Sequence, residues 1–407
     1  MARIVVKFGG TSVGDGQRVR DAARSVVKEI EKGNEVAVVV SAMGKTTNGL
    51  LEALETSTQG KYTPQTKDDI AAMGERTSVR ILAAAIESMG VKAKYFEPPT
   101  SEWPVITNSK FMNATIDLDA TRERVKKYVE PLLKQRTVPV ICGFLGVDKM
   151  GHVTTIGRGG SDTTGVMIGN CLDADEVVIV TDVDGVYSGD PRVVDGAKLI
   201  PEIDVTVLWD LAVAGAKVMK WDSLLYKGKK QTLKIVNNAY VDLSAKGTEI
   251  TGEFMETSVK KLESALGSVT VVGKNLIESV GLLAKTAKVL GDKGVNIWGV
   301  TVAPDSMSYF IGESDVEKAL KLLHEYVLHD DKTASVTSTK GIGLVYVTSP
   351  DFLDEPGALG KITGAMAEAG MNIKEVTTSK SQIMVFIDFK NLSAAYEILK
   401  LLYGKRK

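Results

Sequence analysis

Apolar and polar positions in the first part of the chain follow the patterns of buried strands and amphipathic helices in alternation. Residues 4–8 form an apolar run that predicts a buried strand. Apolar side chains then recur at helical spacing over residues 19–30, and Gly33 is placed to end that helix. Residues 35–40 form a second, β-branched run. Strand, helix and strand in this order predict a βαβ unit with a parallel sheet.

The same alternation of strands and helices continues to about residue 240. Strands are predicted at residues 137–144, 176–181 and 233–237, and helices at residues 165–171 and 208–216. We therefore expect one three-layer α/β/α domain with a mainly parallel sheet over residues 1–255. Residues 241–265 are polar and contain two glycines, which favours a domain boundary there.

The C-terminal part contains an internal repeat with an offset of 76 residues. Residues 281–285 match residues 357–361, and the register holds as far as Ile311 and Ile387. A register kept over this length indicates a duplication. Each copy is predicted as strand, helix, strand, strand, helix, with a further strand from the linking segments, which is the ferredoxin-like βαββαβ plan. We expect the copies at residues 266–338 and 340–407, with hinges around residues 262–267 and 339–341.

Composition excludes several classes of protein. The net charge of −1 gives no general attraction to nucleic acid or anionic membranes. Cys142 and Cys171 lie in apolar stretches and form no CxxC pair, which favours buried structural thiols in a reducing compartment. No stretch approaches the ~20 apolar residues of a membrane span, and the N-terminus leads directly into a strand without a signal-peptide pattern. We therefore expect a cytoplasmic protein.

Three polar loops carry the candidate chemistry. In the first, Lys7 precedes Gly9 and Gly10 at the end of a predicted strand, so backbone N–H groups and one ammonium group can approach an anion. This loop is not a Walker A motif, because no Gly-Lys-Ser/Thr follows at the required spacing. In the second loop, residues 157–164, small residues precede a helix predicted to start near residue 163, and Arg158 can grip a carboxylate.

The third loop, residues 181–192, contains carboxylates, a tyrosine and an arginine, a set that suits a nucleotide with its metal ion. We expect all three loops to lie at the carboxyl ends of parallel strands, where α/β sheets bind ligands.

These segments resemble those of the amino-acid kinase superfamily, and the full set resembles the aspartate kinase family. The resemblance is carried by Lys-Phe-Gly-Gly-Thr-Ser, by Gly-Arg-Gly-Gly-Ser-Asp, by Thr-Asp-Val-x-Gly-Val-Tyr-x-x-Asp-Pro-Arg and by the duplicated tail, which is similar to tandem ACT domains. It covers essentially the whole chain. It implies transfer of the ATP γ-phosphate to the β-carboxylate of L-aspartate, giving 4-phospho-L-aspartate, the first step towards lysine, threonine and methionine.

The resemblance also implies roles for individual residues. The expected catalytic residues are Lys7, Gly10 and Asp162. The acceptor amino acid is expected beside Ser41, Thr47, Glu75, Phe144, Arg158 and Ser161. ATP, with Mg²⁺, is expected at Lys7, Gly9, Gly10, Ser12, Thr181, Asp182, Tyr187, Arg192 and Lys217. An effector amino acid is expected near Gly281, Asn296, Ile297, Trp298, Asn372 and Ile373.

The implied chemistry is consistent with the residue types present. Glu75 would take the ammonium group of the acceptor and Arg158 its carboxylate. The reacting carboxylate is already ionised at neutral pH, with an ordinary pKa of about 3.9, so the reaction needs no general base. Positioning and charge neutralisation then supply the catalysis, with Lys7 acting on the phosphoryl group in transfer.

The chain departs from the family pattern at two places. After residues 216–218 the family usually continues with His-Pro, whereas this chain has Lys220 and Trp221 near the expected nucleotide region. Many relatives have an aspartate where the first repeat has Trp298, and an indole ring binds an ammonium group only through a cation–π contact.

Three alternatives remain to be weighed. Another amino-acid kinase with a glutamate-type acceptor is disfavoured by the tandem repeat and by Thr47-Asn48. A catalytically silent amino-acid sensor is disfavoured by the presence of Lys7, Arg158, Asp162 and Asp182. A nucleotide-dependent dehydrogenase is excluded, because the glycine turn lacks GxGxxG. The duplication also predicts a dimer, or a dimer of dimers, that pairs through the ACT-like copies.

Overall fold

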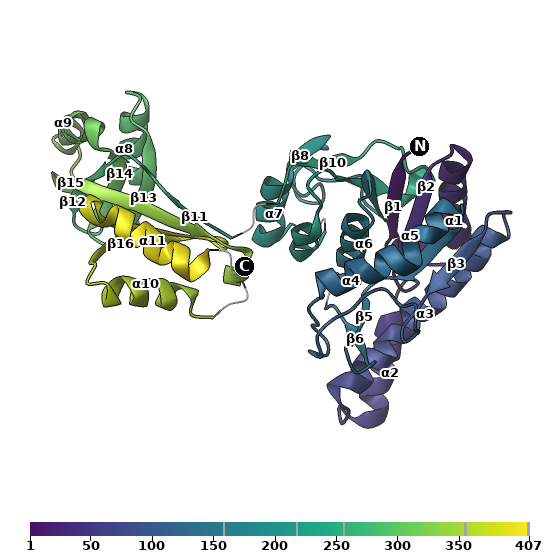
Figure 1. The fold of residues 1–407 in the computed structure, drawn as a ribbon. Helices are drawn as coiled ribbons and strands as arrows, with labels where there is room; N and C mark the ends of the chain where they lie inside the picture. The colour runs from purple at the N-terminus through teal and green to yellow at the C-terminus, as the bar shows by residue number, and fades with distance from the viewer. Residues whose placement is uncertain (158, 217–218, 255–256, 354–355, 405–407) are drawn as a thin grey trace. The chain divides into compact units, whose positions relative to one another are not determined.

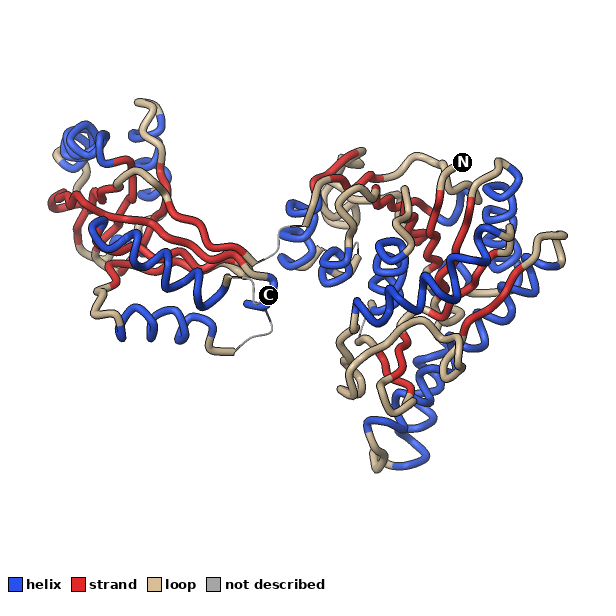
Figure 2. Tube along the Cα trace, viewed as in Figure 1, coloured by secondary structure: helices blue, strands red, loops and turns tan. Residues whose placement is uncertain are grey.

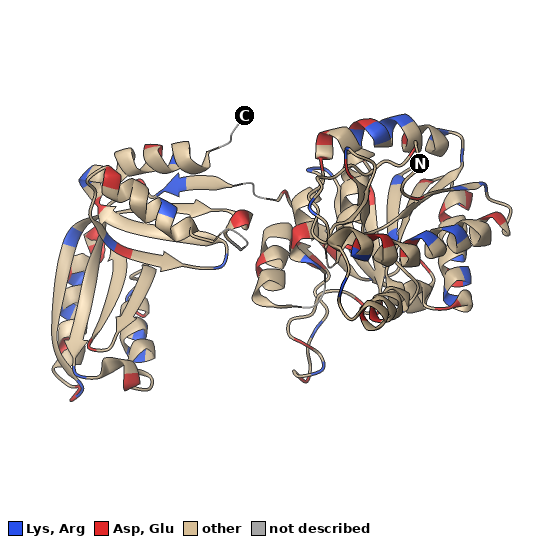
Figure 3. Ribbon diagram, turned by 90° about the horizontal axis from the view of Figure 1, so that it is seen from below, with Lys and Arg blue, Asp and Glu red and all other residues tan. Residues whose placement is uncertain are grey.

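The computed structural model describes residues 1–157, 159–216, 219–254, 257–353 and 356–404, and the chain forms two compact units, Met1–Phe254 and Met255–Lys407. None of the described helices combines the length and the apolar character needed to cross a bilayer. Acidic and basic residues are interspersed on the helices of both units, as expected from the near-zero net charge (Figure 3).

The first unit is built on an eight-stranded sheet with helices on both faces (Figure 1). In spatial order the strands are β3 (Ala93–Phe96), β4 (Val138–Cys142), β2 (Glu35–Val40), β1 (Arg3–Phe8), β7 (Glu176–Thr181), β9 (Thr232–Asn237), β10 (Thr248–Thr251) and β8 (Glu202–Asp204). The strands pair in parallel except β9 with β10, so the expected mainly parallel α/β fold is confirmed.

Two helical layers cover this sheet. On one face lie α1 (Gly16–Glu31) and α3 (Pro64–Glu87), which also contact each other, and α2 (Thr46–Thr58) packs on α3. On the other face lie α4 (Leu118–Arg124), a π-helical turn (Val125–Val129), α5 (Glu130–Lys134) and α6 (Gly160–Cys171). The unit also contains α7 (Val205–Ala214), the 3-10 helices η1 (Gly10–Val13), η3 (Trp221–Tyr226) and η4 (Asn238–Tyr240), and the hairpin of β5 (Leu145–Val147) and β6 (Val153–Thr155).

Helix α1 illustrates how the sequence specifies these elements. The side chain of Asp15 accepts a hydrogen bond from the Arg18 N–H and caps the first turn. The predicted apolar stripe is buried against the sheet, and Gly33 adopts a φ of 89° just beyond the last turn. A left-handed residue at this place ends a helix, and glycine adopts it without strain.

Two predictions for the second glycine loop were wrong. Helix α6 begins at Gly160 rather than near residue 163 or 165, because Gly159, with a φ of 72°, forms the N-cap and the polar loop residues make the first turn. The loop also follows β6 of the antiparallel hairpin and not a parallel strand. The carboxyl end of β4 reaches it nevertheless, since a Cβ at Gly143 would lie 2.7 Å from the Cβ of Ser161.

The second unit is an antiparallel sheet with its helices beside it (Figure 2). Its strands, in the spatial order of the sheet, are β13 (Ile297–Ala303), β14 (Ser306–Gly312), β12 (Leu266–Gly273), β15 (Thr333–Thr348), β17 (Gln382–Asp388) and β16 (Ile373–Thr378), and β11 (Ser258–Lys261) also pairs with β15. Its longer helices are α8 (Leu282–Gly291), α9 (Val316–Val327), α10 (Ala358–Glu368) and α11 (Leu392–Tyr403), and it contains the 3-10 helices η5 (Leu276–Glu278), η6 (Glu313–Asp315), η7 (Pro350–Leu353) and η8 (Phe389–Asn391).

The structure keeps the 76-residue register of the repeat. Ile297 pairs with Ile311 in the first copy, and Ile373 pairs with Ile387 in the second. The two copies obtain their fourth strand from different parts of the sequence. The first half of β15 pairs with β12 in the first copy, whereas β11, which precedes that copy, pairs with the second half of β15. The boundary expected at residue 339 therefore falls inside one continuous strand, and residues 339–341, expected to form a hinge, are part of it.

The two copies contribute equivalent residues to one shared apolar cluster. Phe310 and Phe386, which occupy equivalent positions in the repeat, stack with ring centroids 4.1 Å apart and an interplanar angle of 27°. Leu266 and Ile342, another equivalent pair, are buried in the same cluster. At Gly299 a Cβ would lie 2.9 Å from the Phe386 ring, so this strand position has no room for a side chain.

This cluster predicts that Phe386→Ala destabilises the second unit by about 3–5 kcal/mol, because a fully buried aromatic ring is removed and leaves a cavity. Chemical denaturation of the full chain, followed by the circular dichroism of both units, measures the loss. Phe389→Ala is the matched control, since that ring is 37% exposed and its removal is expected to cost far less. Equal losses in the two variants would contradict this assignment.

Candidate active site

A buried ion pair lies at the carboxyl end of β1. The Lys7 side chain is 9% exposed, and its Nζ lies 2.5 Å from Oδ1 of Asp162 in the first turn of α6. One turn later, a Cβ at Gly165 would lie 2.9 Å from the Cβ of Lys7. Helix α6 can therefore lie directly against β1 only because residue 165 is glycine. The structure thus brings together two of the three residues that the resemblance makes catalytic.

The turn after β1 is closed by backbone contacts. The Gly9 N–H donates to the Val180 carbonyl oxygen at 3.0 Å, and the Gly44 N–H donates to the Gly10 carbonyl oxygen at 3.0 Å. A Cβ at Gly10 would lie 2.9 Å from the Ala42 carbonyl oxygen. Any side chain at residue 10 would therefore separate the turns that follow β1 and β2.

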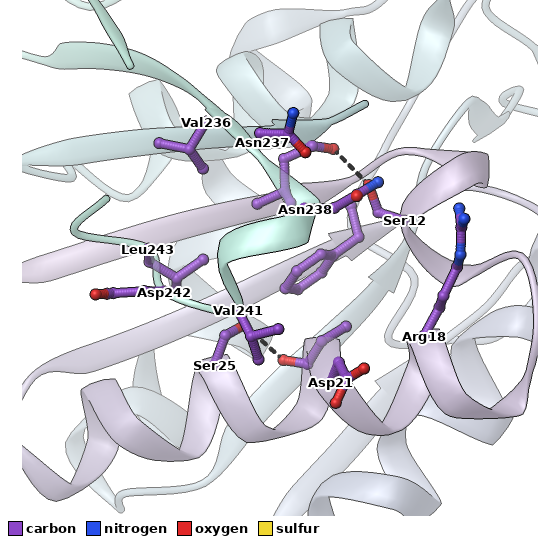
Figure 4. A pocket seen from close by; sticks show the side chains of 13 residues that line it. Ser12, Arg18, Asp21, Ser25, Val236, Asn237, Asn238, Val241, Asp242 and Leu243 are labelled. Carbon is purple, nitrogen blue, oxygen red and sulfur yellow. Dashed lines mark hydrogen bonds between the residues drawn. The ribbon is translucent and has the colours of Figure 1, made fainter. Parts of the chain in front are cut away.

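Ser12, expected at ATP, makes two hydrogen bonds within the protein. Its hydroxyl donates to the Val180 carbonyl oxygen at 3.0 Å and accepts a hydrogen bond from the Asn238 side chain at 3.2 Å. Figure 4 shows the Asn238 amide pointing at Ser12 beside a cavity between α1 and residues 236–243. This cavity has a volume of about 40 Å³, room for a few water molecules, whereas ligand pockets measure several hundred Å³. The two hydrogen bonds therefore give Ser12 a role in holding the turn.

Glu75 is a buried carboxylate with half of its hydrogen-bonding capacity unused. The residue is 4% exposed on α3, and its Oε1 accepts a hydrogen bond from the Ala42 N–H at 3.3 Å. Its Oε2 has no hydrogen-bond partner among the described residues. Burial raises the pKa of Glu75 to about 7, and the N–H of Ala42 and the nearby Thr47 hydroxyl lower it only in part. Among the described residues no basic side chain contributes to this shift, so an ionised Glu75 carboxylate is not paired with a cation there.

Thr47 and Ser41 lie beside Glu75. The Thr47 hydroxyl is also buried and makes no hydrogen bond of standard geometry with any described residue. It packs on α3 where a Cβ at Gly74 would lie 2.5 Å from the Thr47 oxygen. Ser41 follows β2, and its backbone N–H donates to the Phe8 carbonyl oxygen. The Ser41 carbonyl oxygen accepts a hydrogen bond from the Ser78 hydroxyl at 2.6 Å. Two unpaired polar groups at one buried place indicate a site for a polar ligand.

Phe144 has an unusual backbone conformation. Its φ is 68°, which is sparsely populated for an aromatic residue and marks strain that commonly accompanies function. The Phe144 N–H donates to the Thr164 hydroxyl at 3.0 Å, and its ring borders Gly160, where a Cβ would lie 2.9 Å from it. Ser161, 9% exposed, lies in the same first turn of α6. Arg158, expected to bind the acceptor carboxylate, lies outside the described residues.

The third loop, after β7, contains a carboxylate that the sequence analysis did not single out. Asp184 accepts hydrogen bonds from the Tyr187 hydroxyl at 2.9 Å, from Asn237 at 3.0 Å and from the Tyr240 hydroxyl at 3.1 Å. These hydrogen bonds lower the pKa of Asp184. The sequence feature that could have indicated this role is an acidic residue in a Val-Asp-Gly turn close to a tyrosine. Tyr187, expected at ATP, thus holds the loop by its hydroxyl.

The remaining nucleotide residues are only partly brought together. Asp182 is exposed at the end of β7, and its carboxylate accepts a hydrogen bond from the Thr181 hydroxyl at 3.2 Å. Arg192 lies on an exposed turn, where Asp190 binds its guanidinium group at 2.8 and 3.0 Å. The structure does not bring Arg192 into the cluster around Lys7. Lys217 lies outside the described residues.

The described residues contain no group of three or more His, Cys, Asp or Glu side chains that could hold a metal ion. Both cysteines are free and buried, and burial raises the pKa of Cys171 to about 11 and that of Cys142 well above its usual value.

The expected effector residues lie at equivalent places in the two copies. Gly281 is the N-cap of α8, with a φ of 80°. Asn296 precedes the edge strand β13, on which Ile297 and Trp298 lie, and the Trp298 ring is 43% exposed. In the second copy Asn372 and Ile373 stand at the start of the edge strand β16.

Comparisons with known proteins agree with this architecture. A family model described as "Amino acid kinase family" matches residues 2–237, and one described as "ACT domain" matches residues 269–327. The aspartokinase of Mycolicibacterium smegmatis is 33% identical over 427 residues, which cover 99% of this chain and 96% of that protein. The crystal structure of aspartate kinase from Synechocystis matches with a TM-score of 0.78 and 24% identity, over 99% of this chain and 69% of that chain.

A second solved structure, that of E. coli aspartokinase III in complex with aspartate and ADP, also matches. Its TM-score is 0.55 and its identity 23%, over 98% of this chain and 99% of that chain. The chain therefore belongs to the amino acid kinase family and, within it, to the aspartokinases. The family and the fold class expected from the sequence are confirmed.

The buried Glu75 predicts an unusual dependence of stability on pH. Its pKa is about 7 in the folded chain against 4.5 in the unfolded chain, so between these values the folded chain retains a proton that the unfolded chain loses. The contribution of Glu75 to stability is full below pH 4.5 and is lost as the pH rises to 7. The loss is about 3 kcal/mol, because one pKa unit corresponds to about 1.4 kcal/mol. In the absence of ligand, Glu75→Gln is therefore expected to be more stable than the wild type at pH 8 and to lose this advantage at pH 5.

Urea denaturation at several pH values measures this difference. Glu29→Gln is the matched control, since Glu29 is also buried but is bound by Lys32 at 2.7 Å and Asn34 at 2.8 Å. That substitution is expected to destabilise the chain at pH 8. A Glu75→Gln variant that destabilises the ligand-free chain at pH 8 would show that Glu75 is not an uncompensated charge.

Proposed function

We propose that this chain is an aspartate kinase, which transfers the γ-phosphate of ATP to the β-carboxylate of L-aspartate and gives 4-phospho-L-aspartate. This is a step towards amino acids of the lysine, threonine and methionine group. The proposal assigns the acceptor to the region of Glu75, Thr47, Phe144 and Ser161, and the phosphoryl group to Lys7 and the glycine turn that follows β1.

The observation that carries this proposal is the uncompensated carboxylate of Glu75. A buried carboxylate whose Oε2 lacks a partner gains most from a ligand that brings a cation. The ammonium group of an amino acid supplies that cation, and the unpaired Thr47 hydroxyl supplies a further polar contact. An acceptor without a free amino group, such as N-acetylglutamate, would leave Glu75 uncompensated.

The phosphoryl end of the site is preorganised for negative charge. Lys7 is held by Asp162 before any ligand binds, so little reorganisation is needed when charge develops on the transferred group. The exposed Asp182 at the end of β7 fits a metal ion that arrives with the nucleotide phosphates rather than in a protein cage. Mg²⁺ bound in this way would neutralise phosphate charge.

The second unit supports regulation by an amino acid. An ACT domain model matches residues 269–327, and E. coli aspartokinase III, a structural neighbour, has been solved in complex with lysine and aspartate. In this proposal an effector binds near Gly281, Asn296 and Trp298, and their equivalents in the second copy complete an interface between two chains. The partly exposed edge strands β13 and β16 would pair in a homodimer. A cytoplasmic location remains an expectation.

Lys7→Ala is expected to reduce turnover with Mg-ATP and L-aspartate by about 10²–10³-fold, because the preorganised charge at the phosphoryl group is lost. ADP release is measured with L-aspartate, L-glutamate, N-acetylglutamate or water as the acceptor. Lys94→Ala is the matched control, since Lys94 forms a half-exposed ion pair with Glu102 at 2.7 Å and is expected to keep full activity. A wild-type chain without aspartate-dependent ADP release would refute the proposed reaction.

The KM for aspartate is expected to rise about tenfold between pH 8 and pH 6. The acceptor ammonium binds ionised Glu75, and about one tenth of this carboxyl is ionised one unit below a pKa of about 7. Glu75→Gln is expected to have a higher KM at pH 8 that no longer changes with pH. A wild-type KM that stays constant over this range would exclude Glu75 as the ammonium site.

A further inference from the structure

Lys220 belongs to a short segment that is firmly attached to the first unit. It is the residue before η3, and its carbonyl oxygen accepts the Ser223 N–H at 3.1 Å. Helix η3 packs along α6, where the Asn170 side chain donates to the Tyr226 carbonyl oxygen at 2.8 Å. Trp221 packs edge-on against another tryptophan at 6.2 Å. The backbone at Lys220 therefore has a defined position relative to α6.

The methylene chain of Lys220 lies on the glycine that begins α6. A Cβ at Gly159 would lie 2.7 Å from both Cβ and Cδ of Lys220 and 3.1 Å from its Cγ. Gly157 is also near, since a Cβ there would lie 3.8 Å from Nζ of Lys220 and 2.8 Å from Asn113. The φ angles of both glycines are positive, 85° at Gly157 and 72° at Gly159. Gly159 therefore has no room for a side chain while Lys220 occupies this place, whereas the close neighbour at Gly157 is Asn113.

The far end of the Lys220 side chain is held as well. Its ammonium group forms an ion pair with Oδ2 of Asp222, and the two side chains are 25% and 23% exposed. Burial raises the pKa of Asp222, and the ammonium group of Lys220 opposes this effect. Because the backbone and the ammonium group are both fixed, the methylene chain between them has one defined path across Gly159.

We propose that Lys220 is a positioning residue whose methylene chain sets the N-cap of α6, and through it the turn that contains Ser161 and Asp162. Lys220 itself touches neither substrate in this scheme. Gly159 is the contact, and the next three residues contain the hydroxyl expected at the acceptor and the carboxylate that holds Lys7. The kinetic consequence rests on the proposed function, whereas the structural one does not.

The test compares three variants of the full chain. Lys220→Ala removes the side chain beyond Cβ, and it is expected to raise the KM for aspartate about tenfold while the KM for ATP changes less than about twofold. Hydrogen exchange at the amides of residues 159–164 is expected to accelerate. Lys220→Met keeps an unbranched apolar chain of similar length and is expected to restore both properties to near wild-type values. Lys94→Ala is the control for loss of a partly exposed lysine.

Each outcome decides the proposal. Unchanged KM values and unchanged amide exchange in Lys220→Ala would overturn it, as would equal rises in both KM values with a lowered melting temperature. A Lys220→Met variant as impaired as Lys220→Ala would assign the effect to the charge and overturn the proposed role of the methylene chain. If the wild type shows no aspartate-dependent ADP release, the proposed function fails, and the amide-exchange comparison alone decides the role of Lys220.

Discussion

The candidate site depends on close backbone approach at the carboxyl ends of neighbouring strands. At Gly10 and at Gly165 an added Cβ would lie 2.9 Å from its nearest neighbour, and at Gly143 only 2.7 Å. These contacts bring the turn after β1, the turn after β2 and the first turns of α6 to one place. Lys7, Asp162 and Glu75 are then positioned by elements that cannot move apart without losing this packing. The polar side chains can therefore meet because glycines at residues 10, 143 and 165 allow the backbones to approach closely.

The buried charged side chains of the candidate site differ in whether the protein itself neutralises them. Lys7 and Asp162 neutralise each other within the protein, so their burial is compensated before a ligand arrives. Glu75 is left with an unpaired oxygen, and its raised pKa reflects that cost. In the proposed function, the compensated pair faces the phosphoryl group and the uncompensated carboxylate takes the ammonium group of the acceptor.

Sequence patterns predicted the strands and helices of the first unit well where apolar runs were continuous, as at β1, α1 and β2. They failed at α6, because its first turn is built from polar loop residues and depends on the left-handed N-cap at Gly159. The family resemblance pointed to Lys7, Glu75 and Asp162. It did not point to Asp184 as the residue that holds its loop, since that role depends on Asn237 and Tyr240 from another strand end. The origin of the fourth strand in the second copy was also unpredictable, because pairing between distant segments leaves no local pattern.

The arrangement of β11 and β15 has a consequence for the order in which the second unit can form on the ribosome. All strands of the first copy have emerged once the first half of β15 has been synthesised, so that copy is nested inside the other as a complete module. Ser258, at the start of β11, pairs with Thr348, so β11 has no strand to join until the whole first copy has been made. Within the second unit, β11 is thus translated first but can pair only after the first copy is complete.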